Sequence, residues 1–170
     1  MKKISIILLT FLSFTVQAQV KGVTLQASGL TCSMCSNAIF KALQKLEFVD
    51  KVDPNIKTSS FDISFKPNAD IDFDKLKAKV EDAGFFVANF TVTYNFNAIA
   101  IANDKHITVG NSVFHFLNVK DTTLSGEKKI RLIDKGFVSA KEFKKNSGFT
   151  KMACYHSGTD KGQRIFHVTI

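Results

Sequence analysis

Residues 29–46 read GLTCSMCSNAIFKALQKL, and this stretch decides how the first half of the chain folds. Small and apolar side chains recur along it with the spacing of a helix that lies on a sheet. They fall at Cys35, Ala38, Ile39, Ala42, Leu43 and Leu46. We therefore predict an α-helix that begins at the second of two closely spaced cysteines and follows a Ser-Gly turn.

The segments around this helix alternate apolar and polar residues, which is typical of half-buried strands. Alternation over 23–27, 61–65 and 86–90 predicts three strands, and valines at 49 and 52 indicate a short one. A second helix is predicted between Asp72, which can cap it, and Gly84, which can end it in a left-handed conformation. Its buried face is predicted to be Phe73, Leu76, Val80 and Ala83. The fold class is therefore α+β, with a ferredoxin-like βαββαβ order.

The two cysteines of this stretch are candidate metal ligands. Cys32 falls in the loop after the first strand and Cys35 in the first turn of the helix, so both sulfurs can converge on one ion. The positive end of the helix dipole favours thiolate there. Two thiolates satisfy copper(I) or mercury(II), whereas zinc(II) normally takes four ligands. Because no carboxylate lies beside the pair, we expect a soft ion, with copper(I) preferred.

Gly29-Leu30-Thr31-Cys32-Ser33-Met34-Cys35 resembles the Gly-Met-Thr-Cys-x-x-Cys signature of heavy-metal-associated domains. The resemblance covers residues 22–90, including Val80-Glu81-Asp82-Ala83-Gly84-Phe85, and is closest to periplasmic mercuric-ion-binding members and exported copper carriers. It implies that Cys32 and Cys35 bind the ion and exchange it with a metal-donor or metal-acceptor protein, transporters included. It also implies that Leu30, Thr31 and Phe85 support the metal loop, with Leu30 standing where the family has Met.

Two other roles are open to the cysteine pair. A structural disulfide between Cys32 and Cys35 would suit an oxidising compartment. A thiol-disulfide redox or adaptor function is the alternative from a different class. It is disfavoured because Gly-Pro between the cysteines and an aromatic residue before them are missing, and because neither proline is placed to face the pair.

Residues 1–18 carry two lysines and then an apolar run that ends at Val16-Gln17-Ala18. This pattern predicts a signal peptide, and hence a periplasmic or secreted protein with no transmembrane segment after cleavage. From 19 to 90, nine lysines balance nine acidic residues, whereas 91–170 has twelve basic residues against six acidic ones. We therefore divide the chain into a metal-binding domain over 19–90 and a second domain over 91–170.

The second domain is predicted to be a small OB-like β barrel. Strands are expected over 92–101, 107–119, 130–133, 149–156 and 164–170, with a helix capped by Ser139 and Glu142 between the third and fourth. Such barrels often bind single-stranded nucleic acid, and the positive charge would suit it. Export argues against that partner, so we expect no nucleic acid and assign the lysines to a solvated face or a docking surface.

A second metal site is a weaker candidate. Met152, Cys154 and His156 would project from one face of the predicted strand, and His167 on the neighbouring strand could join them. The competing interpretation makes Met152 and Cys154 ordinary core residues. A variant would join Cys154 and His156 to the cysteine pair as an interdomain zinc site. The sequence contains no arrangement typical of a catalytic centre, so we predict an exported metal-binding protein that is not an enzyme.

Overall fold

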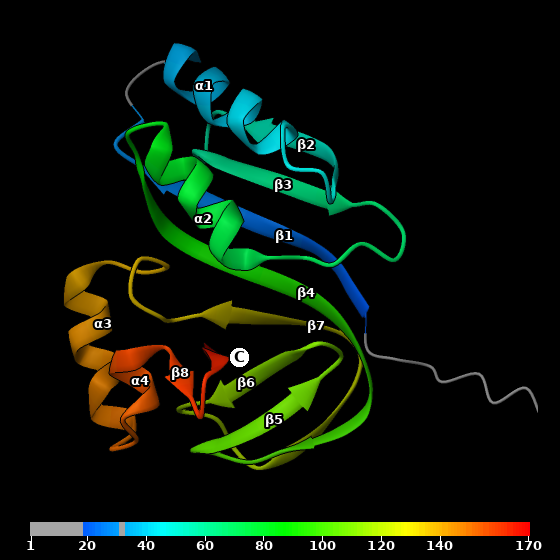
Figure 1. The fold of residues 1–170 in the computed structure, drawn as a ribbon, viewed down its shortest axis with the longest axis vertical. Helices are drawn as coiled ribbons and strands as arrows, with labels where there is room; N and C mark the ends of the chain where they lie inside the picture. The colour runs from blue at the N-terminus through cyan, green and yellow to red at the C-terminus, as the bar shows by residue number, and fades with distance from the viewer. Residues whose placement is uncertain (1–18, 31–32) are drawn as a thin grey trace, which may run out of the picture.

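The computed structural model describes residues 19–30 and 33–170. The first half contains β1 (Gln19–Ser28), α1 (Ser33–Gln44), β2 (Val49–Asn55), β3 (Ser60–Phe65), α2 (Phe73–Asp82) and β4 (Phe86–Ile101). Both helices lie on the same side of the strands (Figure 1). The predicted ferredoxin-like order is confirmed for this half of the chain.

The predicted ends of α2 are also confirmed. The Asp72 side chain accepts a hydrogen bond from the backbone N–H of Lys75 at 3.0 Å, which satisfies a donor that the helix leaves unpaired. Gly84 adopts φ +86°, where an L side chain would be strained, and the chain turns there into β4. These two residues fix the length of α2 and the direction in which β4 leaves it.

The long strand β4 joins the two halves of the molecule. It pairs with β1 along one edge and with β7 (Thr122–Leu132) along the other, so that Val92 is opposite both Val23 and Ile130. The sheet continues past β7 through three further strands, β9 (Gln163–Thr169), β6 (Ser112–Phe116) and β5 (Lys105–Val109), in the order β2-β3-β1-β4-β7-β9-β6-β5. The strand runs through residue 90 without a break, and our division of the chain at that point stays a prediction.

The second half adds β5 (Lys105–Val109), β6 (Ser112–Phe116), α3 (Ala140–Asn146), η1 (Ser147–Phe149), α4 (Cys154–Ser157), β8 (Thr159–Asp160) and β9 (Gln163–Thr169). The expected OB-like barrel is not confirmed. Among the described residues, β5 ends the sheet by pairing with β6 alone, and β6 and β9 are parallel. These strands extend the first sheet because β4 offers its second edge to β7.

Two expected strands of the second half are corrected by the structure. The long strand over 107–119 is a hairpin, because Gly110 takes φ +59° and turns β5 into β6. The strand over 149–156 is wrong, since this segment forms η1 and α4. The Gly158 N–H closes α4 on the Cys154 carbonyl at 2.7 Å, with Gly158 itself at φ +72°. The strand was predicted from residues of similar chemistry at 152, 154 and 156. The segment forms a helical turn instead, which ends at Gly158 in its left-handed conformation.

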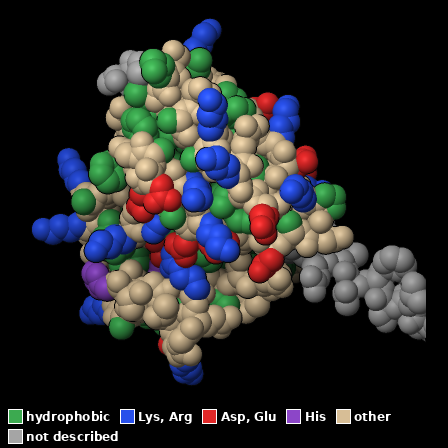
Figure 2. All heavy atoms as spheres, turned by 45° about the horizontal axis from the view of Figure 1, so that its top comes forward, with side chains coloured by type: hydrophobic (Ala, Val, Ile, Leu, Met, Phe, Trp, Pro, Cys, Tyr) green, Lys and Arg blue, Asp and Glu red, His purple; other side chains and the backbone are tan. Residues whose placement is uncertain are grey.

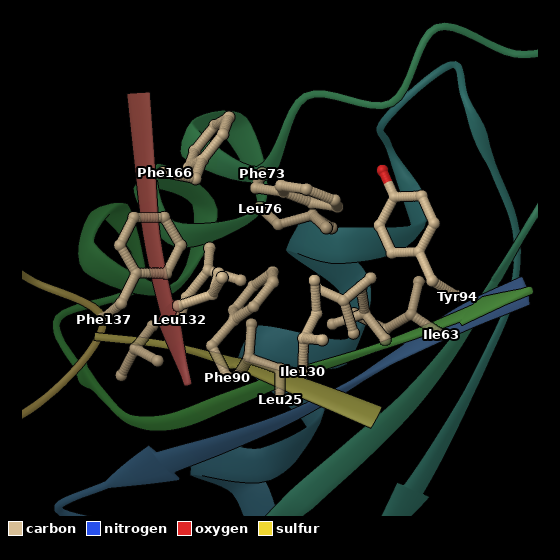
Figure 3. Close-up of a cluster of buried hydrophobic side chains, with 14 of the residues drawn as sticks. Leu25, Ile63, Phe73, Leu76, Phe90, Tyr94, Ile130, Leu132, Phe137 and Phe166 are labelled. Atoms are coloured by element: carbon tan, nitrogen blue, oxygen red, sulfur yellow. The ribbon is translucent and has the colours of Figure 1, made fainter. Parts of the chain in front are cut away.

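One hydrophobic core runs under both halves. Figure 3 shows Phe73 and Phe90 from the first half beside Phe137 and Phe166 from the second. The rings of Phe90 and Phe137 pack edge-on with their centroids 5.0 Å apart, and the ring centroids of Phe73 and Phe166 are 5.3 Å apart. Such pairs each contribute about 0.5–1.5 kcal/mol beyond burial, so the core ties the two halves together.

Charged side chains of both signs are interspersed over the face drawn in Figure 2, although the net charge is +8. Pairs such as Lys51 and Asp53, 2.9 Å apart, are well exposed and contribute about 1 kcal/mol or less. The core, not the surface charge, therefore holds the fold. In the described part of the chain, no helix has the length and apolar character needed to cross a membrane.

Candidate metal centre

The first candidate centre is the loop that leads into α1. Cys35 is the third residue of this helix and is partly buried, while Ser36 and Ile39 anchor the helix on the sheet. Leu30 packs against the core before the loop begins. Thr31 and Cys32 lie outside the described residues, so the distance between the two sulfurs is not described. The structure places Cys35 in the first turn of a helix.

Phe85 lies beside the start of this loop. A Cβ atom added to Gly29 would lie 3.8 Å from Cδ1 of Phe85, so the aromatic ring is in contact range of the loop backbone. Gly29 itself has φ +84°, a conformation that a side chain would strain. This position suits the supporting role that we predicted for Phe85, which stays a prediction.

The predicted second centre is only partly assembled. Cys154 and His167 come together, with 3.5 Å between the Cys154 sulfur and Nε2 of His167. Met152 is 39% exposed, and His156 is exposed on α4 with its ring against Phe143 and Tyr155. Cys154 begins a short helix instead of continuing a strand, which removes the shared face on which the prediction depended.

Two histidines that the sequence analysis missed complete the group. Nε2 of His106 is 3.4 Å from the Cys154 sulfur, and Nδ1 of His115 is 3.5 Å from it. The three histidines form a row across adjacent strands, because His115 is opposite both His106 on β5 and His167 on β9. We call these four residues the imidazole–thiol cluster: His106, His115, Cys154 and His167.

Each imidazole of the cluster also faces a carboxylate. Nε2 of His115 is 2.9 Å from Asp104, and Nδ1 of His167 is 2.8 Å from Asp134. Asp134 also accepts the backbone N–H of His167 at 2.8 Å, and it is 4% exposed. Nδ1 of His106 lies farther from its carboxylate, 3.7 Å from Asp160. Carboxylates behind imidazoles orient the rings and fix which nitrogen carries the proton.

The cluster is unsuited to nucleophilic catalysis. Burial, with a smaller effect of Asp160, raises the pKa of the Cys154 thiol, whereas a reactive cysteine needs a lowered pKa and access to solvent. Burial and the neighbouring His167 lower the pKa of His115, so its imidazole is neutral near pH 7. A hydrogen bond with Thr150 lowers the pKa of Asp104, burial opposes this effect, and His115 adds to it. Asp104 is therefore an anionic hydrogen-bond acceptor. Neutral imidazoles with free lone pairs are metal ligands.

A pattern in the sequence could have indicated His115 and His167. Each lies between apolar residues inside a strand, in Phe114-His115-Phe116 and Phe166-His167-Val168. Where both faces of a strand are buried, a histidine in such a run must find a polar partner. Both are 0% exposed. His106 carries no comparable signature.

The fold and the loop before α1 define an α+β protein with a ferredoxin-like domain. Residues 24–86 match the heavy-metal-associated domain. The mercuric transport protein periplasmic component of Pseudomonas fluorescens is 36% identical over 84 residues, which are 49% of this chain and 91% of that protein. The chain belongs to the heavy-metal-associated family through this part of its sequence, as its resemblance had predicted.

Other relatives share the same region. The probable copper-exporting P-type ATPase of Archaeoglobus fulgidus is 36% identical over 66 residues, which are 39% of this chain but 8% of the ATPase. Oxidized MerP from Ralstonia metallidurans is 34% identical over 41% of this chain and 96% of its own, with a TM-score of 0.38. The yeast copper transporter domain Ccc2a is 31% identical over 39% and 90%, with a TM-score of 0.35. The family match ends at residue 86, before the imidazole–thiol cluster.

Proposed function

We propose that this protein is an exported carrier that captures or delivers one soft metal ion through Cys32 and Cys35, copper(I) by preference and mercury(II) as the other candidate. The observation that carries the proposal is the match of residues 24–86 to the heavy-metal-associated domain, with Cys35 in the first turn of α1 and Cys32 three residues before it in the sequence. Binding and transfer of the ion involve no catalytic turnover.

The chemistry of the pair supports copper(I). Two thiolates can hold a soft ion in two-coordinate sulfur geometry, whereas a harder divalent ion would require further ligands. Cys35 lies at the helix N-terminus, and the exposed side chain of Met34 next to it leaves this end of the domain open to a partner. An open end of this kind is suited to exchange, because a second pair of thiolates can approach the ion and replace the first.

Export and the partner belong to the same proposal. Residues 1–18 have the pattern of a signal peptide, and several relatives are named periplasmic components of mercuric transport. Other relatives are named as copper-exporting ATPases, and one solved complex joins Atx1, copper(I) and Ccc2a. The partner that we propose is therefore a metal donor or acceptor with its own thiolate pair, a transporter included.

The test is copper(I) affinity of the full chain, measured anaerobically against a competing chelator. We expect one tightly bound ion per chain at this pair, and at least a hundredfold weaker binding when Cys32→Ser and Cys35→Ser are combined. Met34→Leu is the matched control, because it changes an exposed side chain between the cysteines and keeps both thiols. Unchanged copper(I) affinity in the double serine variant would exclude the pair as the site.

The redox alternative has a separate test. A thiol-disulfide oxidoreductase would accelerate insulin reduction in the presence of a reductant, with a rate that depends on Cys32 and Cys35. We expect no acceleration above the double serine variant. Turnover that disappears with the cysteines would replace the carrier function with a redox function.

A further inference from the structure

We propose that the imidazole–thiol cluster is a second metal site, for a four-coordinate divalent ion of borderline softness, with zinc(II) as its occupant. It lies in the second half of the chain and uses neither Cys32 nor Cys35. Three imidazole nitrogens and one sulfur would be the ligands, supplied by β5, β6, β9 and the start of α4.

The lone pairs of the cluster call for a cation. Because Asp104 accepts from Nε2 of His115, the proton of that ring is on Nε2 and the lone pair of Nδ1 faces the Cys154 sulfur. In the neutral tautomer that donates its Nδ1–H to Asp134, His167 likewise presents the Nε2 lone pair to this sulfur. A thiol has one proton, so it can satisfy one nitrogen at most. The remaining lone pairs of the cluster point at one another in a buried region, which is unfavourable. A bound cation would accept these lone pairs as coordination bonds.

The distances fit tetrahedral coordination. With Zn–N near 2.05 Å and Zn–S near 2.3 Å, the nitrogen-to-sulfur edge of a tetrahedron is about 3.5–3.6 Å. The three edges measured here are 3.4, 3.5 and 3.5 Å. The ligand atoms of His106, His115 and Cys154 also lie within 4.8 Å of one another. These three ligand atoms could therefore reach one ion after small rotations of the rings. His167 lies outside this group although its Nε2 is 3.5 Å from the sulfur, so its side chain would have to move farther to become the fourth ligand.

Charge favours a divalent ion. A thiolate with three neutral imidazoles carries one negative charge, and the carboxylates of Asp104 and Asp134 lie directly behind two of the rings. Zinc(II) compensates this charge better than copper(I), which also prefers sulfur-rich, low-coordinate sites. Carboxylates that hold the far nitrogen of a ligand histidine are the usual outer partners of zinc sites.

The surroundings point to an ion that is retained. His115 and His167 are 0% exposed and Cys154 is 5% exposed, while the His106 side chain keeps 21% of its surface. The ring of Tyr155 packs edge-on against His167 at 5.0 Å, and its hydroxyl donates to the Ile133 and Phe143 carbonyls. With four protein ligands, such a site is closed and leaves no position for substrate.

Cobalt(II) is the probe, because it takes zinc sites and its tetrahedral thiolate complexes absorb strongly in the visible and near ultraviolet. The experiment uses the full chain carrying Cys32→Ser and Cys35→Ser, so that its outcome does not depend on the first site. We expect one equivalent of cobalt(II), a tetrahedral ligand-field spectrum with a sulfur-to-cobalt charge-transfer band, and displacement by zinc(II).

Three variants in this background test the ligands. Cys154→Ser should abolish the charge-transfer band, and His115→Gln should weaken cobalt(II) binding by at least a hundredfold. His156→Gln is the matched control, since this exposed histidine is two residues from Cys154 and should leave the spectrum unchanged. Circular dichroism establishes that each variant is folded. A folded double serine protein that binds no cobalt(II), or a spectrum that Cys154→Ser and His115→Gln leave unaltered, would overturn the proposal.

Discussion

Arg164 links the two halves of the molecule, and replacing it with methionine tests that link. Its guanidinium binds Asp74 in the first turn of α2, with Nε–Oδ2 at 2.8 Å and Nη2–Oδ1 at 3.2 Å. Nη1 reaches Asp134 at 3.3 Å, and the cation lies 4.2 Å from the centre of the Phe166 ring. Arg164→Met keeps most of the apolar stem and removes every one of these polar contacts.

The expected loss of unfolding free energy is about 2–5 kcal/mol. The pair with Asp74 contributes about 1 kcal/mol or less, because that carboxylate is 39% exposed. The larger part comes from Asp134, which is 4% exposed and keeps only its two bonds with His167 when the arginine is removed. Losing a charged hydrogen bond there costs about 1.5–3 kcal/mol, and the cation–π contact contributes about 0.5–1 kcal/mol.

Urea denaturation followed by circular dichroism measures this loss. Arg131→Met is the matched control, since Arg131 forms a bidentate pair with Glu142 at 2.6 and 2.9 Å and has a similarly exposed side chain. The control should lose about 1–2 kcal/mol, because the pair with Glu142, which is 30% exposed, contributes about 1 kcal/mol or less and the Arg131 hydrogen bond to Asn89 about 1 kcal/mol. Equal losses in the two variants would refute the reasoning that the buried carboxylate of Asp134 makes the difference.

Three further outcomes are expected. Burial lowers the pKa of His115, so as the pH falls below about 6.5 the unfolded chain takes up a proton before the folded chain does. The metal-free protein should therefore lose unfolding free energy on acidification. His115→Gln should reduce the difference in unfolding free energy between pH 7 and pH 5, measured by urea titration at both values. Asp134→Asn should weaken cobalt(II) binding by about 10–100-fold in competition titrations, because the ring of His167 loses its anionic partner. Ser139→Ala should reduce the unfolding free energy by about 1 kcal/mol and so lower the melting temperature, because the Ser139 hydroxyl caps α3 by accepting from the Glu142 N–H at 3.2 Å. A melting temperature equal to that of the parent would show that this cap does not stabilise the fold.

The first half could be predicted from sequence because its determinants are local. Alternation over a few residues gives each strand, and the caps at Asp72 and Gly84 act within one helical turn. The second half could not be predicted in this way. Whether β4 stops or continues depends on what pairs with its second edge, and that partner, β7, begins about 20 residues after β4 ends. The expected barrel is not confirmed, because strand spacing alone does not say whether a sheet closes.

The loop that we propose as the metal site is a similar local case. Cys32 and Cys35 are three residues apart, so any helix that begins between them brings the sulfurs to the same end of the domain. Phe85 is far from Gly29 in the sequence but lies beside it in the structure. The supporting role of Phe85 could be predicted only from the family resemblance. Chemistry that depends on neighbouring residues and one helix start is therefore accessible from the sequence.

The imidazole–thiol cluster depends on register across three strands. His106 and His115 meet through a hairpin whose turn at Gly110 divides the single strand that was expected over 107–119. His115 and His167 meet because β6 and β9 are parallel, a pairing between segments about 50 residues apart. A shift of either pairing by one residue would turn a histidine to the opposite face and direct its nitrogen away from Cys154. The four ligands are assembled only when both registers are fixed, so any variant that alters either one should lose the site even with all four residues present.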